Sequence, residues 1–84
     1  MVTDKLGEAA VPEIEQWANQ IARSTDEKVQ ASIYYDADSS TYVFRLAKGS
    51  RVLLFRLSEA QVHTPGREAE CEKTLKRKIK DLSS

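Results

Sequence analysis

Apolar residues recur at helical spacing near the start of the chain. The stripe comprises Ile14, Trp17, Ala18 and Ile21. Pro12 precedes it, at a position that suits the first turn of a helix. The pattern predicts a helix over about residues 12–23. Residues 1–11 either fray or add an extra helical turn.

Three strand patterns follow this helix. Apolar and polar residues alternate from Val29 to Tyr35 and from Thr41 to Ala47, with turn-forming residues over 36–40 between them. The third run, Arg51 to Leu57, reads RVLLFRL and hardly alternates. Apolar side chains are therefore expected on both faces of this last strand.

The turns predict how these strands pair. A tight turn at Lys48-Gly49 places Ala47 opposite Ser50, and hence Phe44 opposite Leu53. In the same sheet, Tyr34 is expected beside Val43. One face then forms the core side of the sheet, with Ile33, Tyr35, Tyr42, Phe44, Leu53, Phe55 and Leu57.

A second helical stripe ends the chain. It consists of Cys71, Leu75, Ile79 and Leu82. The helix starts at Thr64-Pro65, or a separate helical turn begins earlier at the capping-box sequence Ser58–Gln61. The predicted fold class is α+β, in the order α-β-β-β-α. A three-stranded antiparallel meander carries two helices packed on one face, in a single domain over 1–84.

The opposite face of the sheet is also apolar at its centre. Its residues are Tyr34, Val43, Arg45, Val52, Leu54 and Arg56. Both helices are needed for the core, so neither is left to cover this face. The third strand is also an edge without proline or an inward charge. These features predict a small non-catalytic binding or self-association module whose partner is a protein, including a second copy in a homodimer. Alternatively, Val and Leu are simply good strand formers that remain exposed.

Charge is unevenly distributed in a chain whose formal net charge is zero. Residues 1–40 hold eight acids and three bases, whereas residues 41–84 hold ten bases and five acids. A basic stripe on the last helix is the alternative contact, for non-specific binding of nucleic acid: Lys73, Lys76, Arg77 and Lys80. A solvated helix face explains the same residues, since Glu72 is placed to pair with Lys76.

The predicted order of elements resembles that of double-stranded RNA-binding domains. The resemblance implies RNA contacts from the first helix, the loop between the first two strands and lysines opening the last helix. The matching segments here are 12–15, 36–40 and 65–70, with the sequences PEIE, DADSS and PGREAE. The first two would repel phosphate, and the third is at best neutral. The resemblance supports the architecture and argues against RNA binding through those contacts.

Few residues suggest catalysis or a bound cofactor. His63, the only histidine, is expected in an exposed loop, and Cys71 on the buried face of the last helix. Asp36 and Asp38 are explained by turn formation, without the pattern of a calcium loop. We therefore expect no enzyme, no metal and no cofactor. A single cysteine and the lack of a long apolar run indicate a cytoplasmic protein with no membrane partner.

Overall fold

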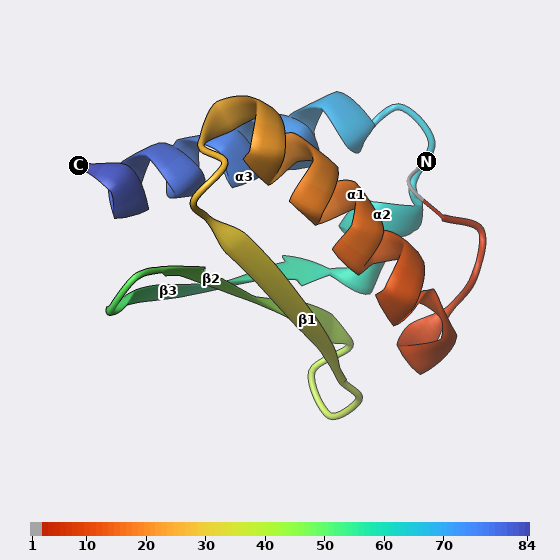
Figure 1. Cartoon of the computed structure of the whole chain (residues 1–84). Coiled ribbons are helices and arrows are strands. Elements are labelled where there is room, and N and C mark those ends of the chain that lie inside the picture. The colour runs from red at the N-terminus through yellow and green to blue at the C-terminus, as the bar shows by residue number, and fades with distance from the viewer. Residues whose placement is uncertain (1–2) are drawn as a thin grey trace.

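The helices and the sheet form two layers (Figure 1). The computed structural model describes residues 3–84. In chain order the elements are a 3₁₀ turn η1 (Gly7–Ala10), α1 (Val11–Thr25), β1 (Gln30–Asp36), β2 (Thr41–Lys48), β3 (Arg51–Ser58), α2 (Glu59–His63) and α3 (Glu68–Ser83). The strands form one antiparallel sheet in the order β1-β2-β3. All helices of the described chain lie on the same side of this sheet (Figure 1). The predicted α+β meander is confirmed.

The core lies between the two long helices and the helix-facing side of the sheet. The central strand β2 contributes Tyr42, Phe44 and Leu46, all fully enclosed. Both predicted helical stripes are buried against them, except that Trp17 lies at the margin and is only partly covered. The predicted buried faces of both helices are therefore confirmed, because residues at this spacing lie on one side of a helix and that side packs on the sheet.

The pairing of β2 with β3 corrects the predicted register. Lys48 lies opposite Arg51, and Phe44 lies opposite Phe55 rather than Leu53. The turn is Gly49-Ser50, with Gly49 at a φ of +60°, because the first central position of a type II′ turn requires positive φ. A shift of two residues leaves every side chain on its predicted face. The pairing of Tyr34 with Val43 is confirmed.

Residues 3–10 form part of the packed structure, which settles the open question about the N-terminal segment. The η1 turn runs directly into α1, as an extra turn would. Glu59 accepts a hydrogen bond from the Gly7 N–H at 2.7 Å, and the Tyr42 hydroxyl donates to the Gly7 carbonyl at 2.9 Å. These two bonds hold the segment against the end of the sheet. Residues 1–2, which belong to the same prediction, lie outside the described chain.

The segment between β3 and the last helix resolves the second open alternative. Ser58 and Gln61 form the predicted capping box, and α2 starts there. The last helix begins at Glu68 rather than at Thr64-Pro65, because Gly66 adopts a φ of +89° that no helix accommodates. His63 corrects another expectation, since it ends α2 and is half-buried instead of lying in an exposed loop.

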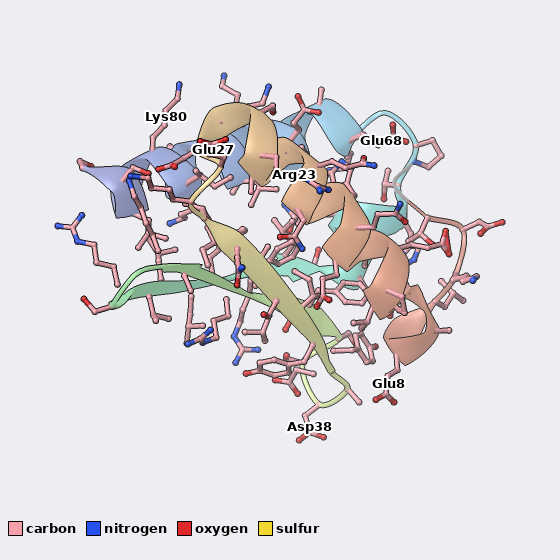
Figure 2. The ribbon with its side chains drawn as sticks, in the orientation of Figure 1. Glu8, Arg23, Glu27, Asp38, Glu68 and Lys80 are labelled. Carbon is pink, nitrogen blue, oxygen red and sulfur yellow. The ribbon has the colours of Figure 1, made fainter. Side chains whose placement is uncertain are left out.

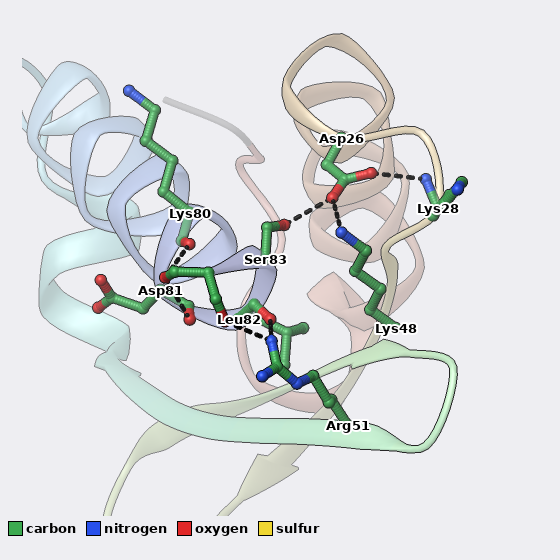
Figure 3. Close-up of polar contacts among 9 residues, drawn as sticks. Asp26, Lys28, Lys48, Arg51, Lys80, Asp81, Leu82 and Ser83 are labelled. Atoms are coloured by element: carbon green, nitrogen blue, oxygen red, sulfur yellow. Dashed lines mark hydrogen bonds and ion pairs between the residues drawn. The ribbon is translucent and has the colours of Figure 1, made fainter.

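An acidic side chain ties together the ends of three elements, as Figure 3 shows. Asp26 follows α1 and accepts hydrogen bonds from Lys48 Nζ at 2.7 Å and from Ser83 Oγ at 2.5 Å. It also accepts from the backbone N–H of Lys28 at 3.1 Å. The pairing with Lys48, followed by the bonds from Ser83 and Lys28, holds the pKa of Asp26 well below its usual range.

The depressed pKa of Asp26 predicts acid sensitivity. Because the unfolded carboxyl group takes up a proton at a pH where the folded one does not, this contribution is present above about pH 4 and declines below it. Asp26→Asn is expected to lower the thermal midpoint at pH 7, and its deficit relative to wild type should shrink as the pH falls below 4. Asp81→Asn, at an exposed site on α3, is the matched control and should lack this pattern. A deficit independent of pH would contradict the assignment.

Candidate interaction surface

Side chains from α1 bond to the outer edge of β1. Asn19 donates to the carbonyl oxygen of Ala31 at 3.0 Å and accepts from the N–H of Ala31 at 2.9 Å. Glu15 accepts from the N–H of Ile33 at 3.0 Å. The N–H and C=O of Ala31 and the N–H of Ile33 are thus already bonded, whereas the C=O of Ile33 and both backbone groups of Tyr35, which also face outward, receive no hydrogen bond from the described residues. The sequence gives no hint of this role, since polar residues beside an apolar helical stripe are ordinary.

The same contacts, followed through the strand pairing, show which backbone groups of β3 point away from the sheet. Because Ala31 faces α1, its neighbours in β1 face β2, and the alternation continues across the antiparallel pairs. On β3 the outward residues are therefore Val52, Leu54 and Arg56. In residues 3–84, no loop or side chain supplies hydrogen bonds to their backbone groups. We call this row the free edge.

The side of the sheet without helices is called the open face, and its exposed apolar residues come from two strands. The exposed fractions are 55% for Tyr34, 49% for Val52 and 60% for Leu54. Leu54 and Tyr34 border a shallow depression of about 330 Å³. Val52 and Leu54 thus carry both an exposed apolar side chain and an unpaired backbone.

Val43 corrects the expected composition of this patch. It lies at the centre of the open face, yet only 2% of it is exposed and it does not belong to the core on the other side. Its direct neighbours in the sheet are Tyr34 and Arg56, whose long side chains share this face. Val43 is consequently the floor of the patch, rather than part of the surface that a partner would touch.

The two arginines of the open face are in different electrostatic environments. Arg56 donates to Asp36 at 2.9 Å and to Thr41 at 3.0 Å. Its guanidinium, together with a hydrogen bond involving Ser39, lowers the pKa of Asp36. Arg45 is exposed and has no ion pair among the described residues. The charge of Arg56 is therefore compensated within the chain, whereas that of Arg45 is available.

The basic stripe of α3 lies on the helical layer, away from the open face. Lys80 points outward from the molecule (Figure 2). Lys76 pairs with Glu72 at 3.0 Å, as its spacing predicts. Lys73, Arg77 and Lys80 are exposed without ion pairs in the described chain. With Lys76 they border a shallow depression of about 520 Å³.

Neither His63 nor Cys71 is arranged as an activated group. Nδ1 of His63 lies 2.8 Å from the carbonyl oxygen of Glu59, and Nε2 contacts the carbonyl oxygen of Lys5. The Cys71 thiol is buried, 3.8 Å from the carbonyl oxygen of Gln61, and its burial raises the pKa of the thiol. No group of three acidic, histidine or cysteine residues within 3–84 is placed to hold a metal ion.

The chain matches no protein-family model, no curated protein and no solved structure at a significant level. Within the described residues, no helix has the length and apolar character needed to cross a membrane.

The contrast between Val43 and Val52 gives a stability test of the open face. Val43→Thr replaces a buried methyl group with a hydroxyl and should cost roughly 1–3 kcal/mol of unfolding free energy. Val52→Thr exposes the hydroxyl to water and should change it by less than about 0.5 kcal/mol. Urea denaturation at low protein concentration measures both. Equal losses would contradict the assignment of Val43 as the buried floor.

Proposed function

We propose that this chain is a non-catalytic interaction module that associates with a second copy of itself through the open face and the free edge. One observation carries the proposal: Asn19 and Glu15 bond to outward backbone groups of β1, whereas all the outward backbone groups of Val52, Leu54 and Arg56 on β3 are unpaired in residues 3–84, beside the exposed side chains of Val52 and Leu54. An unprotected edge strand with apolar side chains is a template for pairing with another chain.

The electrostatics of the surface support association between identical copies. The formal net charge of the chain is zero, so two copies do not repel each other at long range. Arg56 is neutralised locally by Asp36. Arg51, at the start of β3, donates to the carbonyl oxygen of Leu82 at 2.9 Å, so its guanidinium is also engaged within the chain. The proposal includes a cytoplasmic location, which the single free cysteine supports.

Leu54→Glu is expected to abolish self-association. It places a carboxylate at the most exposed apolar position of the open face, where association would strip the charge of water. Light scattering after size-exclusion chromatography, over a concentration series into the high micromolar range, should show a dimer for wild type and a monomer for the variant.

Gln20→Glu is the matched control for Leu54→Glu. It adds the same charge on an exposed position of α1, in the other layer of the molecule, and should leave the dimer intact. A wild-type chain that stays monomeric throughout the concentration series would overturn the proposal of self-association. Equal loss of dimer in both variants would show that net charge, rather than the open face, controls assembly.

Non-specific binding of nucleic acid through α3 is a second candidate. The observation that favours it is the set of cations without ion pairs, Lys73, Arg77 and Lys80, on the outer side of the helix. Cations on one exposed helix face can neutralise neighbouring phosphates. Against it, the end of a helix favours cations whether or not a ligand binds there.

A titration with labelled duplex and single-stranded oligonucleotides at low salt tests this candidate. If it is right, binding weakens with rising salt, and Lys73→Glu combined with Arg77→Glu abolishes it. The control changes two exposed bases outside α3, Arg23→Glu and Lys28→Glu, and should retain most of the binding. Absence of binding, or equal loss in both double variants, would remove the candidate.

A further inference from the structure

We propose that two copies pair along their free edges, β3 antiparallel to β3, with Leu54 opposite Leu54 of the partner subunit. The two sheets then form one six-stranded antiparallel sheet with a two-fold axis at Leu54. This inference rests on the proposed self-association and adds its geometry, since two copies could instead stack their open faces.

Unpaired backbone groups favour the edge over the face. Val52, Leu54 and Arg56 point their N–H and C=O groups out of the sheet, and nothing in residues 3–84 bonds to them. Edge pairing would satisfy them in regular ladder hydrogen bonds. Face stacking would leave them unpaired, and would also have to accommodate the exposed, unpaired guanidinium of Arg45 near the centre of the contact.

The edge of β1 is less available for pairing than the free edge. Asn19 and Glu15 bond to three of the six outward backbone groups of Ala31, Ile33 and Tyr35, whereas none of the six outward groups of Val52, Leu54 and Arg56 is bonded within residues 3–84. Each copy therefore offers one edge whose outward groups are all unbonded, and a two-fold arrangement uses both of these edges at once. A foreign strand could also occupy β3, but self-pairing needs no other component.

The residues of β3 favour one register. With Leu54 on the axis, Val52 lies opposite Arg56 of the partner subunit, and all three outward residues find partners. An axis at Arg56 would place two guanidinium groups directly opposite each other. An axis at Leu53 would pair Arg56 with Ser50 of the partner subunit, which lies in the turn beyond the strand.

Hydrogen exchange of the wild-type amides tests the edge directly. At a protein concentration where the dimer forms, the amides of Val52, Leu54 and Arg56 should exchange about tenfold or more slowly than in dilute monomer. The amides of Leu53 and Phe55 already face β2 and should change much less. A dimer without this alternation would overturn edge pairing and leave self-association standing, whereas a monomer at all concentrations would overturn both.

A pair of substitutions at Val52 separates the backbone from the side chain. Val52→Ala keeps the outward N–H and is expected to weaken the dimer only moderately. Val52→Pro removes that N–H, which an edge strand tolerates on its outer side, and is expected to abolish the dimer. Circular dichroism checks that both variants fold. Equal effects of two folded variants would favour face stacking and contradict the edge geometry.

Disulfide formation tests the register. In a Cys71→Ser background, Leu54→Cys should form a covalent dimer rapidly under mild oxidation, since directly opposed residues have Cα atoms about 5.5 Å apart. Val52→Cys, two residues from the axis, should form it at least about tenfold more slowly than Leu54→Cys, because its opposite residue is Arg56 of the partner subunit. Faster cross-linking at Val52 than at Leu54 would move the axis and overturn the proposed register.

Discussion

The two hydrogen bonds between the Asn19 side chain and the backbone of Ala31 organise much of this molecule. They hold α1 against the outer edge of β1 and occupy both outward backbone groups of Ala31. Together with the pairing of the strands, they show which backbone groups of each strand face out of the sheet. Three strands have two edges, and within the described chain hydrogen bonds from a helix reach only the edge of β1. The outward backbone groups of Val52, Leu54 and Arg56 on the other edge receive none.

A small chain also has two sheet faces and helices for only one of them. The open face partly covers itself, because Val43 is buried beneath the residues around it while Tyr34 and Leu54 remain exposed. Leu54 and Val52 lie on β3, next to the free edge, whereas Tyr34 lies on β1. Exposed apolar side chains and unpaired backbone groups therefore coincide on β3, at Val52 and Leu54.

The uneven distribution of charge along the chain is used within the fold. Asp26 pairs with Lys48, and Asp36 pairs with Arg56, so acids of the first half meet bases of the second. These pairs hold the ends of strands and helices together at the sheet and reduce the charge on β3. The cations of α3 lie on the other layer and take no part in this compensation, apart from the pairing of Lys76 with Glu72.

Hydrophobic spacing by itself determined the order of elements, the two helical stripes and the face on which each strand residue lies. It succeeds because periods of 2.0 and 3.6 residues translate directly into sides of strands and helices. The two-residue error in the predicted register of β3 left every side chain assigned to the correct face of the sheet, since side chains alternate with a period of two. The sequence did not determine whether Gly49 is the first or the second central residue of the turn. In the structure it is the first, with a positive φ.

Only the tertiary structure decided which predicted surface residues are exposed and which edge is free. Val43 and Val52 look alike in the sequence, yet the first is covered because it lies in the central strand between long side chains. The capping of β1 by Asn19 likewise joins residues twelve positions apart through a polar side chain that carries no recognisable pattern. Burial and the protection of a strand edge depend on residues that are close in space, and the hydrophobic pattern along the chain does not specify which residues these are.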